Sequence, residues 1–294
     1  MLLALIVVAS IGDVFYWTSF HAYFAVLGDA EHRGHQIGAR EALADVVGIL
    51  GPLVGGAALT AFGPRIAFGA VAVIQALSAL PLIGAPDVPV VATAPGAFRG
   101  ARLGLLLFAT DGWFAGCFFY AWQVALFLSL GQSLSAYGGA MALAALVGAV
   151  AGMLLGRHID AGHGRRSVLI AYGLAVVVVI LRAASIGSPW LAVAANAPGA
   201  LVAALVMPAL LTPIYNLAQA SPCPLRFNIV SEGGWDIGCF AAALTAAACA
   251  AAHLSLAAPI LAALPGVVIA ILLLLRQYRA STPIDGPCPD KAVV

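Results

Sequence analysis

Charged residues are scarce in this sequence. Asp, Glu, Lys and Arg together account for 9% of the 294 residues, whereas 63% are hydrophobic and the mean hydropathy is +1.05. A soluble domain of this size covers its surface with polar side chains, and about a quarter of its residues are charged. Because this chain lacks the residues for such a surface, we expect most of its surface to face lipid.

Basic clusters and the common catalytic or ligand-binding motifs are also missing. The net charge is +1, and no cluster of Lys and Arg alternates with aromatic residues, so nucleic acid is excluded as an expected partner. The five cysteines are scattered and form no Cys-x-x-Cys pair, which predicts neither a zinc site nor a disulfide framework. We find no nucleophile–base pair, no metal triad and no phosphate-binding loop. His21 and His253 lie near the ends of apolar runs without a partner at ligand spacing. We therefore expect no enzyme activity, no cofactor and no metal.

Long apolar runs are what the sequence does have. A membrane-spanning helix needs about 20 mostly apolar residues, because every backbone amide must form its hydrogen bond within the helix. Nine segments meet this requirement, at residues 2–26, 43–62, 66–85, 103–130, 135–156, 167–186, 190–217, 235–254 and 257–275. The sequence thus predicts an all-α polytopic membrane protein with about nine transmembrane helices.

The longest interruption of the first half, residues 86–102, contains three prolines and predicts a linker. It separates a partial N-terminal bundle of three helices, residues 1–85, from a six-helix bundle at 103–279. A short tail, residues 280–294, follows.

The basic residues predict the orientation. Lys and Arg are retained on the cytoplasmic side of a membrane. Eleven of the thirteen fall on alternate loops and on the tail, while the opposite loops hold Arg65 and Arg182. This pattern places the linker and the C-terminus in the cytoplasm and supports an odd number of spans.

Two motifs resemble signatures of the major facilitator superfamily. The loop GRHIDAGHGRR at 156–166 is similar to the family's cytoplasmic signature, with matches at Gly156, Asp160, Gly164, Arg165 and Arg166. An ordinary basic turn is the alternative interpretation of this loop.

The second motif lies in the segment 43–62, where Gly51, Pro52, Gly55 and Gly56 resemble the fifth-helix motif of proton-coupled antiporters. A packing kink is the alternative, since glycines let helices approach closely. The segment from Arg226 to Gly238 looks like the loop that leads into the family's penultimate helix. The resemblance implies that the nine spans are helices four to twelve of a twelve-helix facilitator, with the first three absent.

Ionisable residues at membrane depth are candidates for function. Asp111 lies in the segment 103–130, which the resemblance places along the central cavity, and Asp13 lies in the first span. We expect Asp111 to bind a proton or contact substrate. A hydrogen bond that holds the bundle together is the alternative. Further candidates for the cavity are Tyr120, Trp122 and Gln123.

Glu41 and Asp45 are four residues apart at the cytoplasmic start of the second span and therefore share a helix face. The resemblance places the 156–166 loop beside them. We expect Arg157, Arg165 or Arg166 to pair with Glu41 or Asp45 and to hold the cytoplasmic side closed.

These features favour a secondary active transporter of a small organic solute, driven by protons, with export slightly favoured over uptake. A bacterial inner membrane is the expected location. Two alternatives stay open: an N-terminally truncated membrane protein that does not transport, and a membrane-embedded enzyme or lipid-handling protein. Substrate and oligomeric state do not follow from the sequence.

Overall fold

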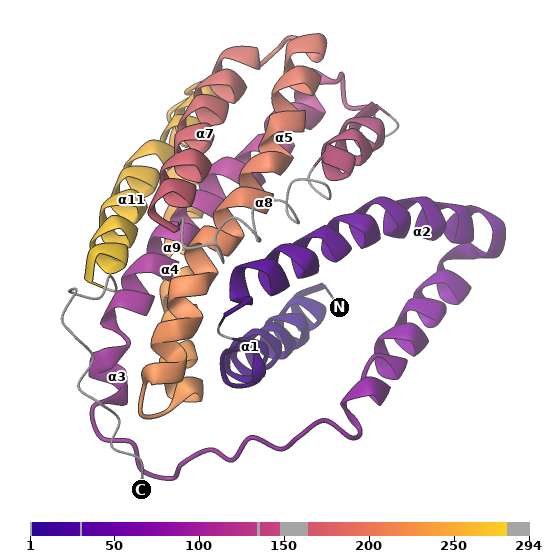
Figure 1. The fold of residues 1–294 in the computed structure, drawn as a ribbon. Coiled ribbons are helices and arrows are strands. Elements are labelled where there is room, and N and C mark those ends of the chain that lie inside the picture. Colours follow the sequence, from indigo (N-terminus) through magenta and orange to yellow (C-terminus); the bar gives the residue numbers. More distant parts are fainter. Residues whose placement is uncertain (1, 30, 134–135, 148–163, 281–294) are drawn as a thin grey trace, which may run out of the picture.

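A computed structural model describes residues 2–29, 31–133, 136–147 and 164–280 of the chain (Figure 1). Throughout these residues the regular structure is helical, and no strand occurs. Six of the described helices are long and apolar enough to cross a membrane: Ala61–Leu82, Arg102–Ser129, Gly164–Ser185, Pro189–Ala220, Pro224–Ala251 and Ala257–Arg279. The chain is therefore a polytopic helical membrane protein.

The N-terminal part consists of two helices, α1 (Leu2–Leu27) and α2 (Arg33–Leu77). Inside α2 the backbone leaves the helical conformation at Gly63, where φ is 77° and ψ is 170°. Pro64 disfavours the helical conformation of the residue before it, and glycine tolerates positive φ. The chain consequently changes direction within α2 (Figure 1), at the point where the sequence separates the second and third predicted spans.

An extended segment connects α2 to the second half of the molecule and contains two short helical elements, η1 (Leu80–Leu82) and α3 (Ala97–Gly100). The Tyr23 hydroxyl of α1 donates a hydrogen bond of 2.9 Å to the carbonyl of Pro86. Arg226 donates one of 2.8 Å to the carbonyl of Ala92. The segment is thus hydrogen-bonded to helices from both halves of the chain.

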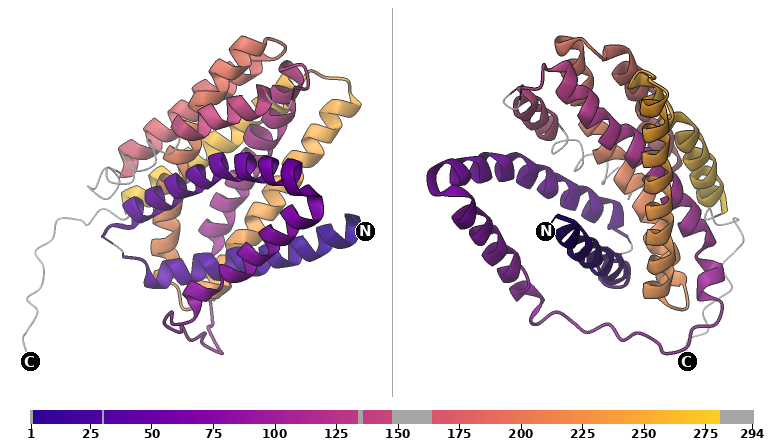
Figure 2. Two further views of the ribbon diagram at one scale, coloured as in Figure 1. Left: turned by 90° about the vertical axis from the view of Figure 1, so that its right-hand side faces the viewer. Right: turned by 180° about the vertical axis from the view of Figure 1, so that it is seen from behind.

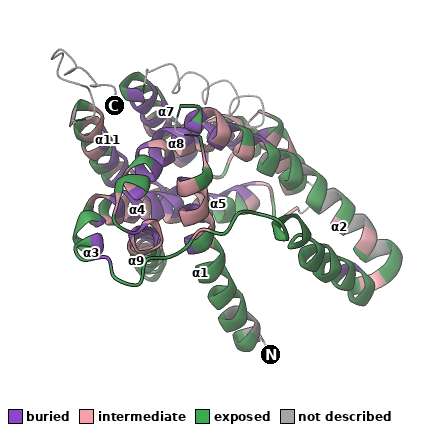
Figure 3. Cartoon of the chain, turned by 60° about the horizontal axis from the view of Figure 1, so that its bottom comes forward, coloured by how far each residue is buried: buried purple, intermediate pink, exposed green. Residues whose placement is uncertain are grey.

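The C-terminal part is a bundle with most of the protein's core. Its elements are α4 (Arg102–Ala115), η2 (Gly116–Tyr120), α5 (Ala121–Ser129), the helix Ala136–Val147, α7 (Gly164–Ser185), α8 (Pro189–Ala220), α9 (Pro224–Ala251), α10 (Ala257–Leu261) and α11 (Ala263–Ala280). Figure 2 shows α1 and α2 beside this bundle. Burial is concentrated in the bundle, whereas α1 and α2 are mainly exposed (Figure 3).

Helices α4 and α9 approach each other most closely, and glycines make this possible. A Cβ atom on Gly238 would lie 2.1 Å from the carbonyl oxygen of Ala109, and one on Gly234 would lie 2.3 Å from that of Leu105. On the facing helix, a Cβ on Gly112 would lie 2.1 Å from the carbonyl oxygen of Trp235. Small residues four apart allow this kind of backbone contact in membrane helices.

The prediction of a loop at residues 226–238 is wrong, because α9 is already helical from Pro224. Proline fits the first position of a helix, where its missing N–H is not needed. Polar side chains in this stretch bond back to their own helix. Asn228 donates to the carbonyl of Pro224, and Ser231 donates to that of Phe227. The other three predicted spans are not among the six and remain predictions: the first lies in α1, the span 43–62 lies within α2, and the span at 135–156 is described only as far as residue 147.

Candidate functional site

A large cavity lies where α1 and the start of α2 meet the bundle. Its volume is about 1070 Å³, and its lining residues come from α1, α2, α4, η2, α8 and α9. Apolar and aromatic side chains form much of the wall. Ligand sites for small molecules are typically clefts of about 300–1,000 Å³ with a few polar groups on an apolar wall.

The polar part of the lining is acidic. Five carboxylates and one arginine line the cavity: Asp13, Glu41, Asp111, Glu232, Asp236 and Arg40. The five are taken from only twelve Asp and Glu residues in the whole chain. Such residues are rare at membrane depth, and they mark ion, proton or substrate sites.

His21 joins α1 to two helices of the bundle. Its Nδ1 lies 2.5 Å from the Tyr215 hydroxyl of α8, and its Nε2 lies 3.1 Å from Glu232 Oε1 of α9. His21 and Tyr215 are buried, with 6% and 1% of their surfaces exposed. A neutral imidazole donates from one ring nitrogen and accepts at the other, so a proton on either side changes both contacts. The arrangement can hold a proton between three helices.

Asp111 is the most deeply buried of the lining carboxylates, with 8% of its surface exposed. Trp235 of α9 lines the same cavity. Gly112, the next residue, is one of the points where the backbones of α4 and α9 touch. This contact fixes Asp111 and the carboxylates of α9 on the wall of the same cavity.

Arg40 lies against the aromatic face of α1. Its guanidinium carbon is 5.4 Å from the centre of the Trp17 ring and 5.1 Å from that of Phe20, within reach of a cation–π contact. Arg40 also forms an ion pair with the neighbouring Glu41. Trp17 in turn stacks on His21, with ring centres 5.6 Å apart.

The structure therefore brings together four residues singled out in the sequence. Asp13, Asp111 and Tyr120 are cavity candidates, and Glu41 belongs to the expected cytoplasmic gate, the ion pairs predicted to hold that side closed. Two other cavity candidates lie elsewhere. Trp122 is buried inside the bundle, and Gln123 is exposed and accepts a hydrogen bond of 3.3 Å from Tyr137.

Trp122 belongs to a polar network in the core of the bundle. Its indole donates to Asn196 Oδ1 at 2.9 Å, and Asn196 donates to the carbonyl of Ala140 at 3.0 Å. Arg182 donates to the carbonyl of Phe118 at 2.7 Å and lies 4.0 Å from the centre of the Phe118 ring.

Phe118 lies in the π-helical turn η2, and such turns alter the regular hydrogen bonding of a helix. Arg182 contributes the hydrogen bond that the Phe118 carbonyl accepts there. The expectation that Arg182 lies in an outer loop is wrong. It is 3% exposed and lies inside α7, where Gly199 of α8 leaves room for its guanidinium.

The expected gate is described only in part. Gly156, Arg157 and Asp160 lie outside the described residues, as does the side chain of Asp45. Arg165 and Arg166 are exposed at the start of α7, and the ion pair that Glu41 forms is with Arg40. Pairing across the gate stays a prediction.

Part of the glycine-proline motif of α2 has no close neighbour in the described structure. A Cβ atom on Gly51 or Gly55 would meet nothing within 4 Å, and the surroundings of Pro52 and Gly56 lie outside the description. A close helix approach at this motif also stays a prediction. Glycines that do touch the backbone of a neighbouring helix include Gly112 of α4 and Gly234 and Gly238 of α9.

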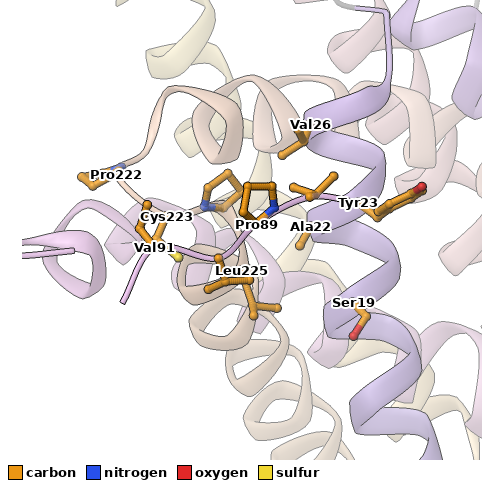
Figure 4. Close-up of a pocket in the computed structure, with 12 residues that line it drawn as sticks. Ser19, Ala22, Tyr23, Val26, Pro89, Val91, Pro222, Cys223 and Leu225 are labelled. Atoms are coloured by element: carbon orange, nitrogen blue, oxygen red, sulfur yellow. The ribbon is translucent and has the colours of Figure 1, made fainter. Parts of the chain in front are cut away.

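A second, smaller cavity of about 220 Å³ lies under the connecting segment (Figure 4). Ser19, Ala22, Tyr23 and Val26 of α1 form one side, and residues 88–91 and 222–225 form the others. Its wall is mostly apolar and contains no charged side chain, so it offers little chemistry.

Sequence reasoning missed His21 and Glu232. A spacing of four from Asp13 through Trp17 to His21 could have placed His21 on the same helix face. Pro224 could have shown that the helix starts early enough to include Glu232. Their meeting across helices has no signal in a single sequence.

Among the described residues, no group of three His, Cys, Asp or Glu side chains is arranged to hold a metal ion. Comparison of the chain with known protein families, curated proteins and solved structures finds no match.

Proposed function

We propose that this chain is a secondary active transporter of the major facilitator type that exchanges a small organic solute for protons, with net export of the solute. The observation that carries this proposal is the acid-lined cavity of about 1070 Å³ between the N-terminal helices and the bundle. Facilitator transporters bind substrate between two helical bundles near the middle of the membrane. The cavity has walls from both parts of the chain, which corresponds to that location.

Asp111 and Glu232 are the proposed proton-carrying groups. Asp111 is nearly enclosed, and Glu232 contacts a histidine that also bonds to a tyrosine. Carboxylate and histidine chains inside membrane proteins commonly relay protons. A proton on Glu232 or His21 would alter the contact between α1 and α9, so protonation can be linked to the relative position of the two parts.

The direction of transport rests on the sequence resemblance. Gly51, Pro52, Gly55 and Gly56 resemble a motif of proton-coupled antiporters, and the 156–166 loop resembles the family's cytoplasmic signature. The glycine-proline motif alone favours export, in which protons enter as solute leaves, and the loop supports only the family resemblance.

The test is proton movement in liposomes that contain the purified protein. A panel of organic solutes of different charge is added across an imposed pH gradient, and internal pH is followed with a trapped dye. We expect at least one solute to drive proton flux that is lost in Asp111→Asn and in Glu232→Gln. The matched control is Asp87→Asn, since Asp87 is exposed in the connecting segment and lines neither cavity.

Proton flux that continues unchanged in both cavity variants would remove these carboxylates from the mechanism. If no solute moves protons through the folded wild-type protein, the alternative of a non-transporting membrane protein is favoured instead.

A further inference from the structure

The charge of the large cavity is unbalanced. Of its five carboxylates, Glu41 is paired with Arg40, the one Lys or Arg among the described residues of the wall. The other four are Asp13 on α1, Asp111 on α4, and Glu232 and Asp236 on α9. His21 is the remaining titratable side chain with a basic ring, and it lies beside Glu232. When ionised, the four carboxylates repel one another and attract positive charge.

The carboxylates surround the cavity and do not converge on a point. They come from three helices, and within the described chain no three acidic, histidine or cysteine side chains are placed to bind one metal ion. A small inorganic cation would need several oxygen ligands at about 2.0–2.6 Å. A larger cation with its charge surrounded by apolar groups has no such requirement.

The aromatic part of the wall suits such a cation. Trp17, Phe15, Phe108, Tyr120 and Trp235 all line the cavity. The faces of aromatic rings attract cations, most strongly those of Trp. Arg40 demonstrates the contact within the protein itself, because its guanidinium already lies over Trp17 and Phe20.

We propose that the solute of this cavity is a monovalent organic cation with an apolar body, such as a quaternary ammonium or phosphonium compound. The carboxylates supply the attraction for the charge, and the aromatic and aliphatic wall contacts the body. This inference rests on the proposed function, in that the cavity is taken as the solute site.

The experiment measures equilibrium binding of tetraphenylphosphonium to the protein in lipid nanodiscs, with empty nanodiscs to subtract partition into lipid. Tetraphenylborate, which has nearly the same shape and the opposite charge, is the probe control. We expect saturable binding of the phosphonium and none of the borate. Asp111→Asn combined with Glu232→Gln should weaken binding at least tenfold, since about 1.4 kcal/mol corresponds to a factor of ten.

Two further pairs, each a wall variant with its control, cover the case in which that double variant does not fold. Asp236→Asn changes an exposed carboxylate of the wall and should weaken binding several-fold, whereas Asp87→Asn should not. Trp17→Leu should weaken it about two- to fivefold through the lost cation–π contact. Trp190→Leu is its control, because Trp190 is 85% exposed at the start of α8 and lies away from the cavity.

Absence of saturable phosphonium binding, binding that the wall variants leave unchanged, or equal binding of the borate would overturn the inference. The outcome is separable from that of the transport proposal. Proton flux driven by a neutral or anionic solute, with no phosphonium binding, would support transport and refute the cation. Charge-dependent phosphonium binding without any proton flux would support the cation site and refute transport.

Discussion

The two halves of this molecule have similar hydropathy but very different burial. An 18-residue stretch within Ala61–Leu82 has a mean hydropathy of 1.7, and only 6% of that stretch is buried inside the protein. The corresponding stretches of Arg102–Ser129 and Pro189–Ala220 have mean hydropathies of 1.4 and 1.8, and 61% and 56% of them are buried. Hydropathy therefore shows that a helix belongs in the membrane and not which helices it touches.

The residues at contacts between helices account for the difference in burial between the two halves. In the bundle, glycines lie where two backbones meet, and a buried arginine and asparagine have partners on neighbouring helices. In α2, a Cβ atom on Gly51 or Gly55 of the 51–56 motif would meet nothing within 4 Å in the described chain. The large cavity lies along the border between these two regions, with acidic residues from both.

The largest effect is expected from an added methyl group at the α4–α9 contact. In Gly238→Ala the new Cβ would lie 2.1 Å from the carbonyl oxygen of Ala109, and the helices must move apart. We expect a loss of about 3 kcal/mol, typical of severe overpacking. Gly12→Ala in α1 is the control. Nothing lies within 4 Å of its Cβ, and alanine favours a helix over glycine by about 0.5–1 kcal/mol. Thermal unfolding in detergent, followed by size-exclusion fluorescence, compares the two. Equal shifts would contradict the difference in packing.

A smaller effect on stability is expected from replacing an arginine in each region, Arg182 in the bundle and Arg65 in α2. Arg182→Met leaves the carbonyl of Phe118 without its donor and should cost about 2 kcal/mol. Arg65→Met changes an exposed residue of α2 and should stay within about 0.5 kcal/mol of the wild type. The same unfolding assay applies. The proposed structural role of Arg182 would be contradicted if both variants unfolded at the wild-type temperature.

The contact between the two regions depends on a buried hydroxyl. Tyr215→Phe removes the group that lies 2.5 Å from His21 Nδ1 and should weaken the attachment of α1 by about 1 kcal/mol. Amide hydrogen exchange of α1 measures this directly and should become faster. Tyr23→Phe removes an exposed hydrogen bond to Pro86, and we expect a smaller increase in exchange. The reverse order would show that the connecting segment holds α1 more firmly than the bundle does.

The smallest effect concerns the turn between α1 and α2. A hydrogen bond from the His32 side chain, followed by one from the backbone of Glu31, lowers the pKa of Asp29 below its ordinary value of 3.8. A carboxyl whose folded pKa is depressed stabilises the fold above its unfolded pKa, and this contribution disappears as pH falls through the folded pKa. Hydrogen exchange at the turn should therefore rise below about pH 4, relative to Asp29→Asn as the reference. Identical pH profiles for wild type and variant would contradict this.

Much of the fold could be predicted from the sequence, because helices in lipid need long apolar runs. The break near Gly63 also follows from local residues, since Gly63 precedes Pro64. The early start of α9 was missed, because Glu232 and its neighbouring glycines are typical of a loop in water. In the structure, polar residues near them bond to carbonyls of their own helix.

The site was harder to predict than the fold. Asp111 could be identified because a carboxylate in the middle of an apolar run is costly to place in a membrane and therefore indicates a function. His21 and Tyr215 are separated by 194 residues in sequence, and nothing in either segment indicates the other. Trp122 is an aromatic residue two positions after Tyr120, and its direction, toward Asn196, is what excludes it from the wall.

The central claim is that one cavity holds either protons or a solute cation on the same carboxylates. The most direct measurement is the number of protons released when tetraphenylphosphonium binds to the protein in weakly buffered nanodiscs, read with a pH-sensitive dye. The account predicts proton release that saturates together with binding in the wild type and in Asp87→Asn, and that is lost when Asp111→Asn and Glu232→Gln are combined. Binding without proton release, or equal release from the double variant, would contradict it.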